Sequence, residues 1–88
     1  MRLKNKTAVI TGGGSGIGLA TARVFSQEGA KIVLFGRRKE KLEKAVDDIN
    51  GSAIFVQGDM TNNDDLDTLI NETLNHFKGI DILVNNAG

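Results

Sequence analysis

Residues 11–18, Thr-Gly-Gly-Gly-Ser-Gly-Ile-Gly, stand between an apolar run that ends at Ile10 and a helical pattern that starts at Ile17. A strand, a glycine turn and a helix in this order form a seat for a phosphate group. Glycine tolerates positive φ angles and lets a ligand approach the main chain closely. The helix directs its unpaired N–H groups and the positive end of its dipole at the turn. The stretch therefore predicts a nucleotide site whose occupant is a pyrophosphate.

Outward from this turn, apolar runs and helical patterns alternate along the chain. Strands are predicted at Thr7–Thr11, Lys31–Phe35, Ala53–Gln57 and Ile80–Asn85. Helices are predicted at Ile17–Glu28, at Lys39–Asn50, and from a cap at Thr61 or Asn62 to near Gly79, with Gly29 and Gly51 closing the first two and Thr61 and Asp64 resembling a capping box. The helix positions expected to face the core are Ile17, Ala20, Val24 and Phe25, then Leu42, Ala45, Val46 and Ile49, then Leu66, Leu69, Ile70 and Phe77.

This alternation predicts an α/β fold, a Rossmann-like doubly wound parallel sheet of which the chain holds the first half. The expected strand order is 3-2-1-4, with the first two helices on one face of the sheet and the third on the other. One helix cannot cover four strands, and the last strand leaves an open apolar edge. We therefore expect residues 1–88 to be the N-terminal part of one larger domain, truncated before its catalytic region, and to expose apolar surface on their own.

Composition excludes several classes of function. The 88 residues carry 11 basic and 11 acidic side chains, so no basic excess is present to bind nucleic acid. Cysteine is absent, which excludes disulfides and thiolate metal sites, and no metal is expected. No apolar run approaches the roughly 20 residues that span a bilayer, and the N-terminus lacks the apolar segment of a secretion signal. The expected localisation is cytoplasmic.

The glycine turn departs from the strict GxGxxG pattern, because its third glycine is displaced to give Thr11-Gly12-xxx-Gly16-x-Gly18. A P-loop is excluded, since Leu19 rather than lysine follows Gly18. Together with Gly58-Asp59-Met60-Thr61 and Asn85-Asn86-Ala87-Gly88, this turn resembles the cofactor-binding motifs of the short-chain dehydrogenase/reductase family. The resemblance extends over the whole of this chain, whereas a family member is considerably longer.

The resemblance implies a role for each matching residue. The turn would wrap the pyrophosphate and the adenosine ribose, with the main chain of Ile17 near the nicotinamide end. The turn residues assigned to cofactor binding are Gly12, Gly14, Ser15, Gly16, Ile17 and Gly18.

Two later segments would complete this binding site. Asp59 would accept a hydrogen bond from the adenine amino group, and the main chain of Met60 would reach the ring. Asn85 would help to hold the central strands. The residues expected to line the ribose region are Asn86, Ala87 and Gly88. Asp59 can also be interpreted as a turn residue, and the two asparagines as structural amides, since both residue types are common in turns.

The choice of cofactor depends on the residues that follow the second strand. An NAD site would place a carboxylate there to bind the ribose 2′-hydroxyl. This chain has Gly36-Arg37-Arg38 instead, and a guanidinium can bind a 2′-phosphate with two hydrogen bonds. The sequence therefore favours NADP over NAD. The alternative is that Arg37 and Arg38 only open a solvated basic segment with Lys39 and Lys41.

Hydride transfer to a carbonyl needs an acid that protonates the developing alkoxide. In the family that this chain resembles, a Tyr supplies the proton with support from Lys, Ser and Asn, and these positions lie beyond the one that matches Gly88. The chain contains no Tyr, so no catalytic residue is assigned to it. His76, the single histidine, is expected to be exposed and to have no catalytic partners.

The expected function is the NADP(H)-binding segment of an oxidoreductase that interconverts an alcohol and a carbonyl compound. As a full-length protein it is expected to form homo-oligomers, which is implied by the resemblance. Two alternatives stay open. One is a non-catalytic module that binds a nucleotide or a partner, and the other is a methyltransferase, which also has a glycine-rich turn after its first strand.

Overall fold

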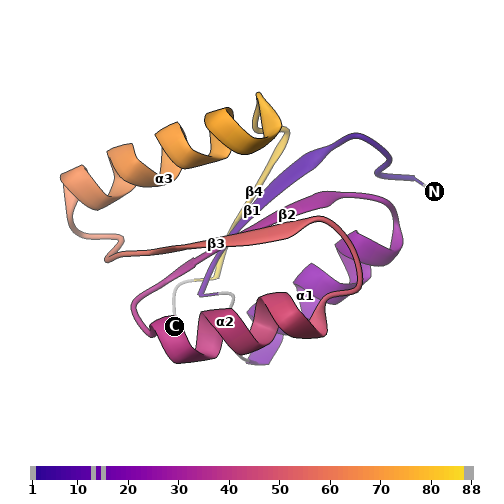
Figure 1. The fold of residues 1–88 in the computed structure, drawn as a ribbon, viewed down its shortest axis with the longest axis horizontal. Helices are drawn as coiled ribbons and strands as arrows, with labels where there is room; N and C mark the ends of the chain where they lie inside the picture. Colours follow the sequence, from indigo (N-terminus) through magenta and orange to yellow (C-terminus); the bar gives the residue numbers. More distant parts are fainter. Residues whose placement is uncertain (1, 13, 15, 87–88) are drawn as a thin grey trace.

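The structure, a computed structural model, describes residues 2–12, 14 and 16–86, and strands alternate with helices along them (Figure 1). The elements are β1 (Thr7–Thr11), α1 (Gly16–Gln27), β2 (Lys31–Gly36), α2 (Lys39–Asp48), β3 (Ala53–Gln57), α3 (Asn63–Phe77) and β4 (Ile82–Asn85). The predicted α/β alternation is confirmed.

The four strands form one parallel sheet in the order β3-β2-β1-β4, as predicted. Ala8 of the central strand β1 lies opposite Ile32 of β2 and Ile82 of β4. Because all strands run the same way, their carboxyl ends meet at one edge of the sheet. The loops that follow the strands are therefore brought together there, and a doubly wound sheet binds its ligands at this edge.

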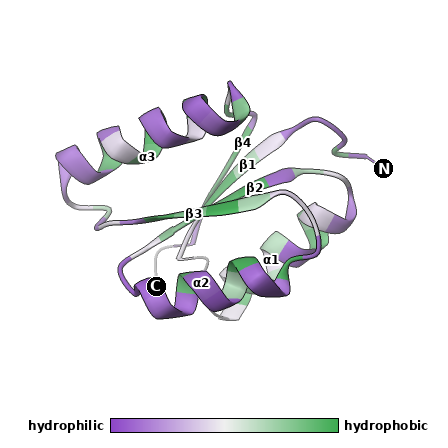
Figure 2. Cartoon of the chain, in the orientation of Figure 1, coloured by the Kyte–Doolittle hydropathy of each residue, from purple (hydrophilic) through white to green (hydrophobic). Residues whose placement is uncertain are grey.

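The sheet separates two apolar layers, since successive side chains of a strand point to opposite faces. Figure 1 shows α1 and α2 on one face and α3 on the other, as predicted. The residues buried beneath α1 and α2 are Ala8, Ile10, Ala22, Ala30, Ile32, Leu34, Leu42, Ala45 and Ile49. Those buried beneath α3 are Val9, Val33, Phe35, Val56 and Leu69. Figure 2 shows the same division, with hydrophobic residues concentrated on the strands and on the sheet-facing sides of the helices.

The prediction of the buried face was correct for α2 and wrong for much of α1. Ile17 is 75% exposed and Val24 is 54% exposed, and Ala20 is exposed as well. The buried residues of α1 are Gly18 and Ala22. Small side chains one turn apart let the helix lie close to the sheet, while Leu19 and Phe25 pack partly buried against the core, so the prediction holds for Phe25.

The prediction for α3 was correct for three positions of four. Leu69 is buried, Leu66 and Phe77 pack against the same core, and Ile70 is 46% exposed. No second helix covers this face among the described residues (Figure 1), so Ile70 has no neighbour to bury it.

The ends of the helices agree with the prediction in most details. The helix α1 lies one residue earlier than predicted, and Gly29 follows it with a φ of 94°, as expected of a helix stop. Of the two predicted caps of α3, Asn62 is the one observed, because its side chain accepts hydrogen bonds from the main-chain N–H groups of residues 64 and 65. The helix α3 ends at Phe77, near Gly79 as predicted, and the left-handed residue after it is Lys78. Gly51 does not close α2, which ends two residues earlier than predicted at Asp48.

The edge strand β4 is shorter than predicted and exposes apolar surface. It begins at Ile82 rather than Ile80, which is 42% exposed. Leu83 on β4 is 65% exposed, and this confirms the predicted open apolar edge. Within the part of the chain that the structure describes, no helix is long and apolar enough to cross a membrane.

Candidate functional site

A cleft of about 840 Å³ lies at the edge of the sheet where the carboxyl ends of the strands meet. Ligand pockets in proteins commonly measure about 300–1,000 Å³. The described residues that line the cleft are Thr11, Gly12, Gly14, Gly16, Ile17, Phe35, Gly36, Arg37, Arg38, Lys41, Leu42, Gly58, Asp59, Met60, Thr61 and Asn86. Loops after all four strands contribute to it, so the three sequence motifs meet at one place.

The glycine turn is packed so closely that side chains would not fit at two positions. Gly12 has a φ of 65°, and a Cβ there would lie 2.5 Å from the carbonyl oxygen of Asn86. A Cβ on Gly18 would lie 2.3 Å from the carbonyl oxygen of Gly12. Gly18 therefore lies buried beneath the turn, while Gly12 lies on the wall of the cleft. The main chain is left accessible for a ligand, which is what a pyrophosphate seat requires.

The end of β1 is tied to the end of β4 through one buried hydroxyl. The side chain of Thr11 accepts a hydrogen bond from the main-chain N–H of Asn86 at 3.0 Å. Its hydroxyl lies 3.1 Å from Oδ1 of Asn85 and 3.3 Å from the carbonyl of Val84, and it can donate to either. These bonds agree with the expectation that Asn85 helps to hold the central strands, and they place Asn86 beside the glycine turn.

The segment after β2 brings positive charge to the cleft. Arg37 and Arg38 are exposed and line the cleft, and neither takes part in the ion pairs formed among the described residues. Nε2 of Gln57 donates a hydrogen bond to the carbonyl of Arg37 at 3.2 Å, which ties this segment to the end of β3. The N-cap residue of α2 is Arg38, whose side chain makes no capping hydrogen bond. The first N–H groups of α2 therefore remain available to an anion.

The segment after β3 holds Asp59 in a tight turn. The main-chain N–H of Thr61 lies 2.9 Å and its hydroxyl 2.8 Å from Oδ1 of Asp59. Hydrogen bonds from the N–H and then the hydroxyl of Thr61, together with the nearby Arg37 guanidinium, lower the pKa of Asp59 below its usual value of 3.8. Asp59 is therefore a carboxylate, and an acceptor only, at neutral pH.

The structure brings together most of the residues that the sequence assigned to the cofactor. Gly12, Gly14, Gly16, Ile17, Arg37, Arg38, Asp59, Met60 and Asn86 line the cleft, and Gly18 lies beneath it. Ser15, Ala87 and Gly88 lie outside the described residues. The turn interpretation of Asp59 is also correct in its geometry, since its side chain accepts a hydrogen bond two residues along the chain.

Lys41 and Thr61 line the cleft although the sequence analysis assigned neither a role in cofactor binding; Thr61 is the last residue of the motif Gly58-Asp59-Met60-Thr61. Lys41 lies in the first turn of α2, four residues after Arg37, and both residues line the cleft. An aspartate followed two residues later by threonine is the pattern of a side-chain-closed turn. Both signals were present in the sequence, but Thr61 was interpreted as a helix cap and Lys41 as part of a solvated segment.

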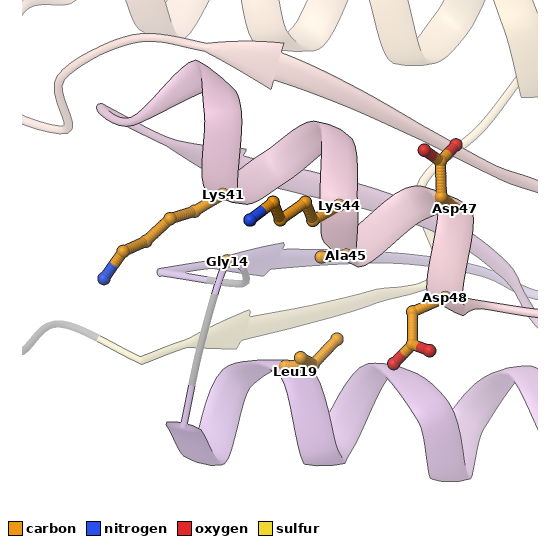
Figure 3. Close-up of a pocket in the computed structure, with 7 residues that line it drawn as sticks. All are labelled: Gly14, Leu19, Lys41, Lys44, Ala45, Asp47 and Asp48. Atoms are coloured by element: carbon orange, nitrogen blue, oxygen red, sulfur yellow. The ribbon is translucent and has the colours of Figure 1, made fainter.

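A second groove, of about 590 Å³, lies between α1 and α2 (Figure 3). Leu19 and Ala45 point into it, and Asp48 reaches down from α2 toward α1, where it pairs with Arg23. Lys41 extends from α2 past Gly14, a residue of the glycine turn, and Asp47 points away from α1. Of the four charged residues that line this groove, Asp48 is paired with Arg23 and Asp47 points away from α1.

Other candidate chemistry is not supported. His76 is about half exposed and pairs with Glu72 one turn earlier on α3, at 3.6 Å. Among the residues that the structure describes, no group of three or more His, Asp or Glu side chains could hold a metal ion.

Comparison with known proteins gives matches along nearly the whole chain. A family model described as short chain dehydrogenase matches residues 6–88. An uncharacterized oxidoreductase of Staphylococcus epidermidis is 42% identical over 87 residues, which are 99% of this chain and 38% of that protein. The chain thus spans well under half the length of this relative.

Solved structures give the same result. A short chain dehydrogenase from Bacillus anthracis matches with a TM-score of 0.93 and 45% identity, over 98% of this chain and 36% of that one. L-sorbose reductase from Gluconobacter frateurii, complexed with NADPH and L-sorbose, matches with a TM-score of 0.91 and 39% identity, over 100% and 36%. These matches favour a dinucleotide-binding sheet over the methyltransferase alternative.

Proposed function

The chain belongs to the short-chain dehydrogenase family, and we propose on that premise that it is the NADP(H)-binding segment of an oxidoreductase. The observation that carries the proposal is the cleft in which the glycine turn meets the loops after β2, β3 and β4. Residues 1–88 would form the N-terminal part of a single NAD(P)-binding domain. The remainder of the protein would supply the groups that act on an alcohol or carbonyl substrate.

The residues of the cleft fit a dinucleotide. Gly12 and Gly18 leave no room for side chains, so the main chain of the turn is free to receive the pyrophosphate. Asp59 would accept a hydrogen bond from the adenine, and Asn86 would line the ribose region. When bound, the nicotinamide supplies or accepts the hydride. The residues of the cleft would bind and orient that group.

The segment after β2 supports NADP over NAD. Two guanidinium groups and the uncapped start of α2 meet at this corner of the cleft, and each favours a phosphate. The sequence Gly36-Arg37-Arg38 places no carboxylate directly after β2, where an NAD site would have one for the 2′-hydroxyl. The ribose 2′-phosphate would bind between Arg37 and the start of α2.

The test is a fluorescence titration of the intact protein that contains this chain with NADPH and with NADH. Wild type should bind NADPH more tightly. Arg37→Ala should weaken NADPH binding by roughly ten- to a hundredfold, because a hydrogen bond to a charged group contributes about 1.5–3 kcal/mol. NADH binding should change little. Lys39→Ala is the matched control, since Lys39 pairs with Glu43 along α2. Equal loss of both cofactors in Arg37→Ala would contradict the assignment.

The proposal extends to self-association of the full-length protein, which light scattering of the intact protein would test. A second candidate function is a non-catalytic module that binds the nucleotide without turnover. Residues 1–88 contain no Tyr, so this segment itself offers no candidate for the proton donor that the chemistry needs. A measurement of mass separates the two: a protein of 9.4 kDa would be the module, and a larger one has room for the catalytic part.

A further inference from the structure

The connection between α2 and β3 contains an asparagine followed by a glycine, Asn50-Gly51, and both residues are exposed. The sequence predicted that α2 reaches Asn50, but the helix ends at Asp48 and the backbone of Ile49 is already extended, with a φ of −87° and a ψ of 120°. Asn50 therefore lies outside the helix. Because this connection leads into β3, it lies at the amino end of the sheet, away from the cleft.

The chain is held on both sides of this pair but not within it. The N–H of Ile49 donates to the carbonyl of Ala45 in α2 at 3.1 Å, and the carbonyl of Ser52 accepts a hydrogen bond from β2 at 2.9 Å. Neither the N–H of Gly51 nor the side-chain amide of Asn50 has a hydrogen-bond partner among the described residues. Both groups are therefore free to meet each other.

The other asparagines whose following residue is described have at least one of these two groups engaged. The N–H groups that follow Asn71 and Asn75 belong to α3 and donate within that helix. The remaining asparagines engage either the side chain or the next N–H, and they are Asn5, Asn62, Asn63 and Asn85. Asn50 differs from all of them in leaving both groups without a partner in this part of the chain.

We propose that Asn50-Gly51 is a site of spontaneous deamidation, in which the main-chain nitrogen of Gly51 closes on Cγ of Asn50. The nitrogen–Cγ bond forms, the bond from Cγ to Nδ2 breaks, and the proton of the Gly51 N–H leaves with Nδ2 as ammonia. Water then opens the five-membered imide at either of its carbonyls, which gives aspartate or isoaspartate at position 50. The product adds one negative charge beside Asp47 and Asp48 at the end of α2.

Glycine favours the ring closure because it has no Cβ to obstruct the approach and because its backbone is the least restricted. The fold itself does not require glycine at this position. Gly51 has no positive φ, and a Cβ there would lie 2.7 Å from Oγ of Ser26. This oxygen ends a short side chain that can rotate away. Gly51→Ala should therefore fold, while it removes the freedom that the reaction uses.

The test incubates the intact protein that contains this chain in mildly alkaline buffer, once folded and once unfolded in guanidinium chloride, and follows each asparagine by peptide mass spectrometry. Trypsin releases residues 45–78 as one peptide, in which fragment ions separate Asn50 from Asn71 and Asn75. Each asparagine is compared with itself in the two states, which removes the effect of the neighbouring residue.

The two states should differ only at the helical asparagines. At Asn50 the folded and unfolded rates should agree within about threefold, because no hydrogen bond has to break. At Asn71 and Asn75 the folded protein should react at least about tenfold more slowly than the unfolded one, because α3 must open first.

Gly51→Ala keeps the asparagine and should slow its conversion at least about tenfold in both states. A circular dichroism spectrum like that of wild type shows that this variant is folded. Gly79→Ala makes the same change after α3, where a Cβ meets nothing within 4 Å, and should leave the rate at Asn50 unchanged.

Conversion of Asn50 more than about threefold more slowly in the folded protein would overturn the inference, because the fold would then restrain this residue. A Gly51→Ala protein that converts Asn50 as fast as wild type would also overturn it, since the glycine nitrogen would not be the limiting group. Neither readout involves the cofactor, so a failure of the proposed function leaves this inference standing.

Discussion

Replacement of Gly18 by alanine tests whether the close packing beneath the turn matters. A Cβ at this position would lie 2.3 Å from the carbonyl oxygen of Gly12 and 3.0 Å from Nδ2 of Asn86. Ordinary carbon–oxygen contacts are about 3.3–3.6 Å, so the Gly12 carbonyl must move by roughly 1 Å. Both obstacles belong to the cleft wall, so the displacement reaches the site itself.

Two opposing terms set the size of the effect. Overpacking costs about 1–3 kcal/mol, and the cost lies at the upper end here because the nearest obstacle is main chain. Alanine is favoured over glycine inside a helix by about 0.8–1 kcal/mol. The net loss in the free energy of unfolding should therefore be about 2 kcal/mol. NADPH affinity should fall about tenfold or more, which corresponds to the loss of roughly one hydrogen bond to the phosphates.

The assay is urea unfolding of the intact protein, followed by circular dichroism at one protein concentration, together with an NADPH titration. Gly79→Ala is the matched control, because a Cβ there meets nothing within 4 Å and the residue has no positive φ. It should be neutral or slightly stabilising. The reasoning is refuted if Gly18→Ala unfolds at the wild-type urea concentration or above it and binds NADPH as wild type does.

Three further substitutions test other contacts. Thr11→Val removes the hydroxyl that accepts a hydrogen bond from the N–H of Asn86 at 3.0 Å, so the free energy of unfolding should fall by about 1–3 kcal/mol. An unchanged free energy of unfolding in a urea titration would argue against a stabilising role of this hydrogen bond. Thr61→Val should raise the pKa of Asp59 toward 3.8, since the N–H bond stays but the hydroxyl bond is lost. The lowered pKa of Asp59 stabilises the folded wild-type protein above pH 3.8, and this contribution is lost as the pH falls through the folded-state pKa. The Thr61→Val variant loses part of this contribution, so it should unfold in acid at a higher pH than wild type. A carbon NMR titration that shows no rise in the pKa of Asp59 would contradict this. Gly58→Ala puts a Cβ 2.8 Å from the ring of Phe35 and should cost about 1–3 kcal/mol, part of which Phe35→Leu recovers; strictly additive costs in the double mutant would disprove the clash.

The sequence predicted the sheet well because its strands are continuous apolar runs. β1 and β3 have the predicted bounds, and β2 is longer by one residue, Gly36. The glycine turn was also predictable, since only glycine suits a turn that packs against Asn86 and lies over Gly18. The strands and the glycine turn depend on the residue types within short segments, and these can be read directly from a single sequence.

The sequence could not predict how close α1 lies to the sheet. Hydrophobic periodicity gives most weight to large side chains such as Ile17 and Val24, and these lie outside. Helix and sheet meet instead at Gly18 and Ala22, whose small size carries little weight in such a pattern. Of the two predictions made for Ile17, its place at the cofactor turn agrees with the structure and its place in the core does not, because it lines the cleft and is exposed.

Lys41 and Thr61 needed tertiary information. Thr61 fits a helix cap as well as a turn in the sequence, and the choice is made by Asn62, which occupies the cap with two hydrogen bonds. Lys41 enters the cleft because α2 starts beside the glycine turn, where a Cβ on Gly14 would lie 3.1 Å from that of Lys41. No local pattern states that these two segments are neighbours.

The site separates the residues that shape it from those that select its ligand. Gly12 and Gly18 shape it through main-chain packing, so a change at either one disturbs both stability and binding. In the proposed site, Arg37 would select the cofactor through an exposed side chain, while its main-chain carbonyl accepts a hydrogen bond from Gln57 that does not depend on that side chain. Cofactor choice can therefore change at Arg37 with little cost in stability, whereas the pyrophosphate seat cannot change without it. We therefore expect Arg37→Ala to unfold at the same urea concentration as wild type while its preference between NADPH and NADH changes.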